Sequence, residues 1–227
     1  MSDFFLELKI AKASIHKNPF IGLFLKTNDE VTLAPPGLPK KNAEQIRDVL
    51  GTRVVHVLIE QSPLVGLLAA MNSKGIALPC FAEKHAVALL KKEGLNPLVF
   101  KGPLTPGNLI VCNDRCALVS PLVPSDEAKR IGDAFGVEVF QQALAGSTVV
   151  GATCVANNNG VLAYNEASEI ELKFLEKIFH CKAVGGTSNF GTVCNCLGVI
   201  ANDRAVLVGE TTTGFELQRV FEAFTKD

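Results

Sequence analysis

The sequence lacks a long apolar run, an excess of charge of either sign and a glycine-rich nucleotide loop. No stretch approaches the ~18 apolar residues of a membrane span, and the first residues, MSDFFLELKIAK, alternate and carry charges, unlike a secretory signal. The net charge of −1 argues against a broad polybasic surface, so any contact with nucleic acid would have to be local. Residues 98–108 lack the spacing of a nucleotide-binding loop. We therefore expect a cytoplasmic protein that binds neither a membrane nor a nucleotide.

Cysteine pairs at metal-binding spacing are also absent. The seven cysteines are an odd number without a C-x-x-C pair, whereas zinc sites need clustered ligands at set spacings. Five of them fall in or beside apolar, strand-like runs: Cys112, Cys116, Cys154, Cys194 and Cys196. This pattern favours reduced thiols packed as small hydrophobic side chains over a disulfide framework. We predict no metal and no cofactor.

The sequence does contain a repeat. An apolar run begins at a glycine or a cysteine, and an asparagine follows six residues later, five times in all. The starts are Gly22, Gly66, Gly107, Gly151 and Cys196, and the asparagines are Asn28, Asn72, Asn113, Asn157 and Asn202. Successive asparagines are 44, 41, 44 and 45 residues apart. A period of this size indicates a propeller, a solenoid or an array.

Each repeat predicts a β-hairpin, then a helix, then a strand. The asparagine opens a short polar segment between two apolar runs, which is typical of a hairpin turn that needs positive φ. Runs such as 64–70 show little alternation and predict strands buried on both faces. Helices are expected near 42–50, 82–93, 125–135, 169–179 and 213–224, and closing strands near 53–59, 97–101, 137–141 and 182–184. Capping-box spacing marks three helix starts, Asn42 with Gln45, Ser168 with Glu171 and Thr213 with Glu216, and three helices end at Gly51, Gly94 and Gly136.

The count of strands predicts a closed ring. The fifth unit ends at its helix without a closing strand, while residues 4–13 alternate as a strand does and precede the first hairpin. A ring in which residues 6–13 complete the fifth unit leaves no unpaired unit. We therefore predict one α/β domain over residues 1–227. Its repeats are expected at 17–61, 62–104, 105–146, 147–191, and 192–227 together with 1–16.

Several short motifs carry a resemblance to a known family over nearly the whole chain. They are Gly107-Asn108 followed by Cys112-Asn113-Asp114, Val137-Glu138-Val139, Val150-Gly151 followed by Asn158-Asn159-Gly160, Gly186-Thr187 with Asn189 and Gly191-Thr192, and Asn202-Asp203 with Thr211-Thr212-Thr213 and Glu216-Leu217. Taken together they resemble the translation initiation factor 6 family. The resemblance implies the pentein fold, a five-bladed α/β propeller of ββαβ repeats. The chain departs from the family pattern at Pro35, Pro36 and Pro39, at Cys196, and at Phe190, where a basic residue is expected.

The resemblance implies binding rather than catalysis. Members of the family bind the large ribosomal subunit near the sarcin–ricin loop and the L14-type ribosomal protein, and they prevent association with the small subunit. We accordingly expect a monomeric, non-enzymatic ribosome anti-association factor that takes part in protein biosynthesis and ribosome biogenesis. A rigid ring suits this task because it loses little conformational entropy on docking and excludes another large body by its volume.

Two other functions stay open. Penteins include hydrolases and transferases of guanidino substrates, which use a cysteine nucleophile, a histidine and carboxylates. The dipeptide His180-Cys181 is placed by the pattern at a helix end, however, and residues 206–210, where such enzymes carry their cysteine, contain neither cysteine nor histidine. His16, His56 and His85 lie far apart in sequence. The third possibility is a pentein that acts only as a scaffold.

The repeated turns supply the candidate binding residues. Each asparagine has a structural explanation, because the turn itself favours it. As a set, the turns must share one rim of the ring, where exposed amides with charged neighbours could meet a protein helix or an RNA backbone. The candidate ribosome-binding residues are Asn72, Lys74, Asn113, Asp114, Arg115, Asn157, Asn202 and Arg204. The third turn is the most favoured contact, and the opposite rim or an outer helix face is the alternative.

Overall fold

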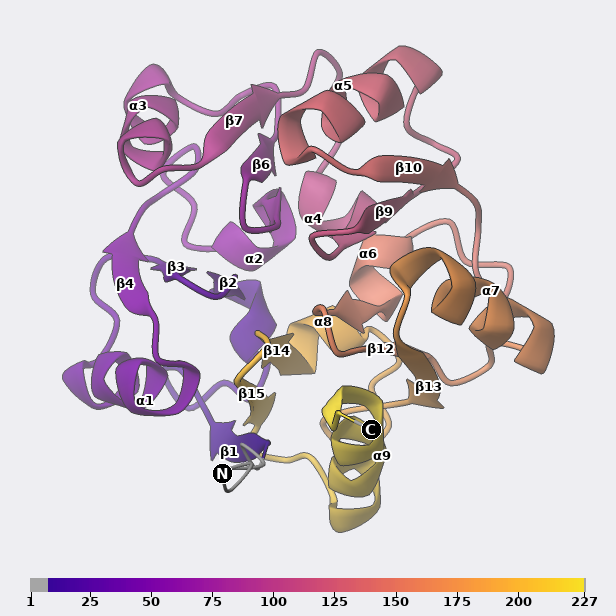
Figure 1. Ribbon diagram of the computed structural model, residues 1–227. Helices are drawn as coiled ribbons and strands as arrows, with labels where there is room; N and C mark the ends of the chain where they lie inside the picture. Colours follow the sequence, from indigo (N-terminus) through magenta and orange to yellow (C-terminus); the bar gives the residue numbers. More distant parts are fainter. Residues whose placement is uncertain (1–7, 227) are drawn as a thin grey trace, which may run out of the picture.

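The computed structural model, which describes residues 8–226, shows five similar units arranged around a common centre (Figure 1). Each unit has one three-stranded sheet and one outer helix. A short inner helix precedes the sheet and lies close to the centre of the ring. The two ends of the described chain meet in the fifth unit (Figure 1).

The five units run through the same elements in the same order. Unit 1 contains η1 (Ile21–Leu23), β2 (Lys26–Thr27), β3 (Val31–Ala34), α1 (Lys40–Leu50) and β4 (Arg53–His56). Unit 2 contains α2 (Val65–Leu68), β5 (Ala70–Met71), β6 (Gly75–Leu78), α3 (Lys84–Lys92) and β7 (Asn96–Val99). Unit 3 contains α4 (Pro106–Leu109), β8 (Ile110–Cys112), β9 (Cys116–Val119), α5 (Ser125–Phe135) and β10 (Glu138–Gln141).

Units 4 and 5 repeat the pattern, and the fifth takes its closing strand from the start of the chain. Unit 4 contains α6 (Val150–Thr153), β11 (Val155–Ala156), β12 (Gly160–Tyr164), α7 (Glu169–Phe179) and β13 (Lys182–Gly186). Unit 5 contains α8 (Asn195–Gly198), β14 (Val199–Ala201), β15 (Ala205–Gly209), α9 (Gly214–Phe224) and β1 (Lys9–Ala13).

Every sheet has the same strand order. The strand after the polar turn is central, the strand before that turn is antiparallel to it, and the closing strand is parallel to it. In unit 5 the parallel partner is β1, with Lys9 opposite Ala205 and Ala13 opposite Gly209. The prediction that the N-terminal strand completes the fifth unit is therefore confirmed over these residues. Residues 4–7 of the predicted strand lie outside the described part of the chain.

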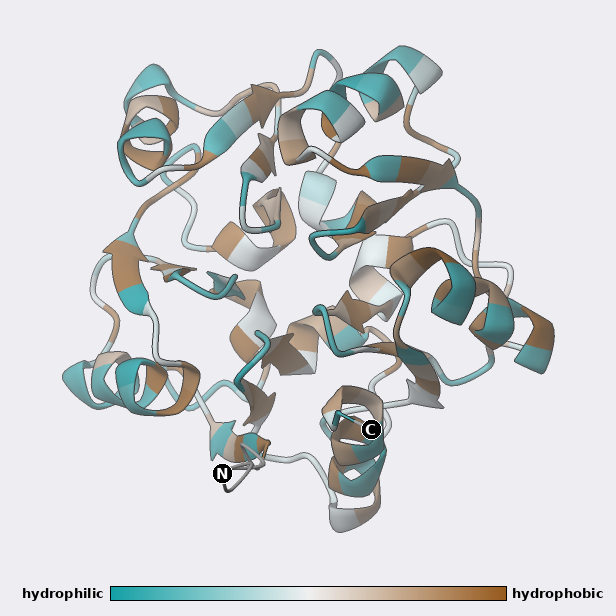
Figure 2. Cartoon of the chain, viewed as in Figure 1, coloured by the Kyte–Doolittle hydropathy of each residue, from teal (hydrophilic) through white to brown (hydrophobic). Residues whose placement is uncertain are grey.

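The hydrophobic core lies between neighbouring units. Val31 and Leu33 of β3 share one buried cluster with Ile76, Leu78 and Leu90 of the next unit. Each of the other four clusters likewise joins residues of two adjacent units. In Figure 2 the outer helices alternate between hydrophilic and hydrophobic residues, as expected of helices with one buried face. A single unit could not bury its apolar surface alone, so the units depend on one another for stability.

The predicted helix ends are partly confirmed. Ser168 and Thr213 each form a complete capping box, with Glu171 and Glu216 respectively, and Gly51 and Gly136 end their helices in the left-handed conformation. The capping box at Asn42 is wrong, because α1 begins earlier, after Pro39. The side chains of Asn42 and Gln45 instead donate to the carbonyls of Ser14 and Lys12, at 2.8 and 2.7 Å, and so hold α1 against the end of β1.

The prediction of a strand over 64–70 is also wrong, because Val65–Leu68 forms the helix α2 and only Ala70–Met71 is a strand. Apolar runs without alternation do not distinguish a buried strand from a short buried helix. The repeated glycine explains the helix. A Cβ atom added at Gly66 would lie 1.8 Å from the carbonyl oxygen of Gly22, and one at Gly107 would lie 2.4 Å from that of Gly66. Backbone therefore packs on backbone at the four repeated glycines, Gly22, Gly66, Gly107 and Gly151, which only glycine permits.

This packing predicts a large cost for the smallest added side chain. Gly66→Ala should destabilise the protein by roughly 1–3 kcal/mol, because the methyl group overlaps backbone that cannot move independently. The matched control is Gly102→Ala, where an added Cβ meets nothing within 4 Å. Urea unfolding of both variants measures the difference, and equal stability of the two would contradict the packing argument.

Candidate functional site

The five repeat asparagines form a closed ring of hydrogen bonds across the units. The side-chain Nδ2 of each asparagine donates to the backbone carbonyl of the asparagine in the next unit. The distances are 3.0 Å from Asn28 to Asn72, 3.3 Å from Asn72 to Asn113, 3.3 Å from Asn113 to Asn157, 2.7 Å from Asn157 to Asn202, and 3.4 Å from Asn202 to Asn28. We call this end of the molecule the asparagine end. The last bond joins unit 5 to unit 1 and closes the ring.

The other half of each amide holds its own turn. In the third unit, Asn113 Oδ1 accepts from the backbone N–H groups of Arg115 and Cys116 at 2.9 and 3.0 Å. The same pair of bonds recurs at the other four asparagines. Asparagine is needed for this bonding and not for positive φ, so that part of the turn prediction is wrong. The non-glycine residues with positive φ in the described chain are instead His16, Lys17, Glu60, Gln61, Ala145, His180, Asn189 and Phe190.

Four of the predicted binding residues are therefore buried. Asn72, Asn113, Asn157 and Asn202 are between 2 and 6% exposed, and both halves of each amide are hydrogen-bonded within the chain. These amides therefore point into the molecule and are not displayed on its surface, and binding by the turns that they hold stays a prediction.

A second tier of hydrogen bonds surrounds the first. After four of the five asparagines, the backbone N–H of the following residue donates to a side chain of the next unit, from Ser73 to Asp114, from Asp114 to Asn158, from Asn158 to Asp203 and from Asp203 to Asp29. Asn158 also donates its amide to the carboxylates of Asp114 and Asp203, at 2.9 and 2.8 Å. The predicted site residue Asp114 thus acts as a link between units.

Two carboxyl groups in this tier differ in acidity. Burial acts to raise the pKa of Asp114, but hydrogen bonds from Ser73 and Asn158 outweigh it and place the pKa below its ordinary value. Burial dominates at Asp29, with the charge of Asp203 adding to it against a backbone hydrogen bond, so the pKa of Asp29 is raised. The stability contributed by Asp114 is therefore present above its unfolded pKa and is lost as the pH falls through its folded value.

The predicted basic residues lie over the ends of outer helices in the next unit. Arg115 donates to the carbonyls of Phe179 and His180 at the end of α7, at 3.3 and 3.0 Å. Arg204 donates to the carbonyls of Leu50 and Gly51 at the end of α1. Lys74 lies beside Gly136, the residue that ends α5, since a Cβ added there would come within 3.2 Å of Lys74 Cδ. Cations at helix C-termini are favourable because they face the negative end of the helix dipole.

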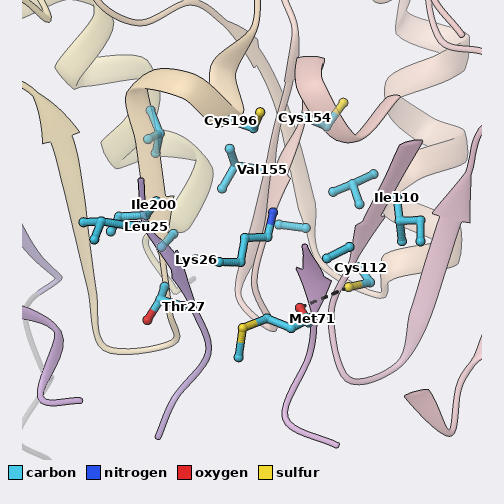
Figure 3. A pocket seen from close by; sticks show the side chains of 15 residues that line it. Leu25, Lys26, Thr27, Met71, Ile110, Cys112, Cys154, Val155, Cys196 and Ile200 are labelled. Carbon is cyan, nitrogen blue, oxygen red and sulfur yellow. Dashed lines mark hydrogen bonds between the residues drawn. The ribbon is translucent and has the colours of Figure 1, made fainter. Parts of the chain in front are cut away.

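The centre of the ring tests the enzyme alternative. A cavity of about 50 Å³ is lined by residues of all five units, including Cys112, Cys154, Cys196 and Lys26 (Figure 3). Its lining contains neither a histidine nor a carboxylate, so a cysteine–histidine–carboxylate constellation is not assembled there. All seven cysteines are free thiols. Among residues 8–226, no group of three or more histidine, cysteine, aspartate or glutamate side chains is placed to hold a metal ion.

The dipeptide His180-Cys181 lies at the end of α7, as the sequence pattern predicts. His180 is the left-handed C-cap residue of the helix. Burial raises the pKa of the Cys181 thiol to about 11, against the weaker opposing charge of Arg115. A thiol with this pKa is almost entirely protonated near neutral pH, and it therefore lacks the character of an activated nucleophile.

The opposite end of the ring was expected only as an alternative surface, and sequence reasoning named none of its residues except Phe190. The central strands begin directly after the asparagine turns and the closing strands run parallel to them, so the loops that follow both strands lie at the opposite end. We call this the loop end. Of the eight exposed large hydrophobic side chains in the described chain, seven belong to these loops or to the first turns of the helices that follow them. They are Phe81, Leu122, Val149, Ile170, Phe190, Val193 and Phe215.

Phe190 and Phe215 are the most prominent aromatic members of this set. They are 82 and 74% exposed, and Glu216, the neighbour of Phe215, accepts from the backbone N–H groups of Phe190 and Gly191 at 3.1 and 2.7 Å. Phe190 has a φ of 61°, an uncommon conformation for a bulky residue. The one sequence signal for this surface is Phe190 itself, an aromatic residue where a basic one is expected.

These observations define a class of protein, a ring of five repeated α/β units joined at its axis by side-chain amides. Comparison with known proteins identifies the family. The chain matches the sequence model of the eIF-6 family over residues 10–223, and it belongs to that family. Within residues 8–226, no helix is long and apolar enough to cross a membrane.

Similar proteins carry the name translation initiation factor 6. The factor from Pyrobaculum arsenaticum is 38% identical, over 88% of this chain and 91% of its own length. The factor from Pyrococcus abyssi is 36% identical, over 95% of this chain and 98% of its own. The factor from Saccharolobus islandicus is also 36% identical, over 95% and 99%. The alignments therefore span nearly the whole ring.

The buried amides predict that the asparagine ring is a stability determinant. Asn113→Ala should cost roughly 2–4 kcal/mol, because it leaves the N–H groups of Arg115 and Cys116 and the carbonyl of Asn157 without their partner. The exposed Asn165 supplies the control, and Asn165→Ala should change stability by less than about 0.5 kcal/mol. Urea unfolding measures both. An Asn113→Ala variant as stable as the control would refute the structural role.

Proposed function

We propose that this protein binds the large ribosomal subunit and prevents the small subunit from joining it. The observation that carries the proposal is membership of the eIF-6 family over nearly the whole chain. The proposed partners are the L14-type ribosomal protein and the sarcin–ricin loop region of the ribosomal RNA. We propose further that the protein acts as a monomeric, single-domain pentein in the cytoplasm, and that it acts by binding alone.

The geometry favours the loop end as the docking surface. Exposed apolar side chains that gather on one face mark sites of protein interaction, and the seven side chains of the loop end gather there from several units. The polar groups of the asparagine end are largely used within the chain, by the amide ring and by the two arginines that cover helix ends. The candidate residues of the asparagine turns remain a competing surface that the same experiment tests.

The physical basis of the proposed activity is exclusion by volume. A ring whose units share their core and close through the asparagine bonds presents a preorganised face, so docking costs little conformational entropy. Aromatic side chains such as Phe190 and Phe215 are typical anchors of protein–protein interfaces, which fits contact with a ribosomal protein. Once the loop end is occupied, the rest of the disc stands where an approaching subunit would have to fit.

The alternative of a pentein enzyme is not favoured. The central cavity lacks the histidine and carboxylates that guanidino chemistry requires, and the thiols that line it have raised pKa values. We therefore expect no conversion of arginine, agmatine or related guanidines above the uncatalysed rate. Measurement of ureido and ammonia products at high protein concentration checks this. Turnover that disappears in Cys112→Ser, Cys154→Ser or Cys196→Ser would contradict a purely binding role.

The choice of surface predicts a specific loss of affinity. Phe190→Asn combined with Phe215→Ser should weaken co-sedimentation with purified large subunits at least tenfold, because buried aromatic anchors contribute about 2 kcal/mol or more when they are hot spots. Asparagine tolerates the positive φ at position 190, so folding should be retained. The matched variant at the asparagine end is Lys74→Glu, which reverses an exposed charge and should bind as the unchanged protein does.

Each result of this experiment has a different meaning. Selective binding to large subunits that is lost in Lys74→Glu and kept in the double variant would move the docking surface to the asparagine end. Selective binding that survives both changes would reject both surfaces and keep the function. Failure of the unchanged protein to bind cognate large subunits would overturn the proposed function itself. A subunit-joining assay with the small subunit then tests the anti-association step.

A further inference from the structure

The central cavity contains a single charged side chain that the ring does not explain. Lys26 of β2 extends into the cavity, and the remaining lining residues are apolar side chains, thiols and Thr27 (Figure 3). The position two residues before the repeat asparagine is Ala70, Val111, Val155 or Ile200 in the other units. A lysine is therefore not demanded by the packing of the repeat.

The ammonium group of Lys26 has no partner within the part of the chain that the structure describes. Across residues 8–226, no hydrogen bond or ion pair reaches its Nζ. The carboxylates of the neighbouring asparagine end are committed elsewhere, since Asp114 and Asp203 bond to Asn158 and Asp29 accepts from the backbone of Asp203. A half-buried cation without a counter-charge is unfavourable unless water or an anion compensates it.

The three thiols that surround Lys26 do not supply that charge. Burial raises the pKa of Cys112 and Cys196 to about 12, although the charge of Lys26 opposes the shift at both, and burial raises that of Cys154 to about 11. The thiols are therefore neutral near pH 7. A neutral thiol is a weak hydrogen-bond donor. Cys112 uses its S–H toward the carbonyl of Met71 at 3.3 Å.

The size and the walls of the cavity limit the ligand. A volume of about 50 Å³ exceeds the roughly 10–15 Å³ needed for one water molecule, and it is far below that needed for a nucleotide or a sugar phosphate. Apolar walls lower the local dielectric constant and strengthen the attraction between an ammonium and an anion. A compact ion with one negative charge matches both the space and the charge.

We propose that the centre of the ring is a binding site for one monovalent inorganic anion of the size of chloride or bromide, with the Lys26 ammonium as its counter-ion. The cavity is lined by residues of all five units, so an ion bound in it would stabilise the axis from within. Because an unfolded chain has no such site, binding stabilises the folded ring by mass action. Such a stabilising ion site is independent of the proposed ribosomal function.

Thermal unfolding at constant ionic strength tests this site. Replacing fluoride by chloride or bromide should raise the unfolding midpoint of the unchanged protein saturably, by about 2–4 °C. Lys26→Met keeps most of the length of the side chain and removes the charge, and it should abolish the saturable shift. The control is Lys173→Met, which removes an exposed lysine on α7 and should respond as the unchanged protein does. An equal halide response in Lys26→Met would overturn the proposal.

A direct measurement keeps the test decisive if Lys26→Met fails to fold. Anomalous diffraction from crystals of the unchanged protein grown in bromide should show one peak inside the cavity near Lys26 Nζ. Bromide peaks on the outer surface only would overturn the proposal, because they would assign any stabilisation to general salt effects. A peak in the cavity that is lost in Lys26→Gln would identify the lysine as the counter-ion.

Discussion

The closed ring of asparagine side-chain bonds is the interaction on which the rest of this structure depends. Each amide both shapes its own turn and bonds to the next unit, so one residue type couples local geometry to assembly. The bond from Asn202 to Asn28, at 3.4 Å, joins residues 174 positions apart and completes the circle. A hydrogen bond to a buried amide adds modestly to the stability of the fold, but a buried amide left without its partner costs much more. The bonds therefore favour the arrangement in which all five units are in register.

Other interactions build outward from this axis. The residue after each asparagine forms the second tier of bonds, and the next residue places Lys74, Arg115 or Arg204 over a helix end of the following unit. On the other side of the axial turns, glycines let the short helices pack backbone against backbone. The hydrophobic clusters then fill the space between units. Each of these interactions joins one unit to the next. The five units therefore form one rigid body, which is suited to covering a surface.

This arrangement separates the two ends of the molecule by role. The asparagine end is rich in polar residues whose hydrogen bonds are directed inward, whereas the loop end carries exposed aromatic and aliphatic side chains on segments that the core does not need. Polar residues at a repeated turn can thus serve the assembly of the ring, as these do. The turns that recur most regularly are those that assembly requires. Phe190 lies in a loop that differs from unit to unit, and Phe215 lies in the first turn of α9.

The sequence by itself determined the number of units, their order of elements and the completion of the fifth unit by the N-terminal strand, because periodicity and strand count are properties of the chain alone. It also determined the caps at Ser168 and Thr213, where partners are three residues apart. Only the tertiary structure decided that 65–68 is helical, that Asn42 bonds to Ser14, and that the asparagine amides face one another instead of a partner. The partners in these cases come from other units, so they are decided by ring closure and backbone contact between residues distant in sequence.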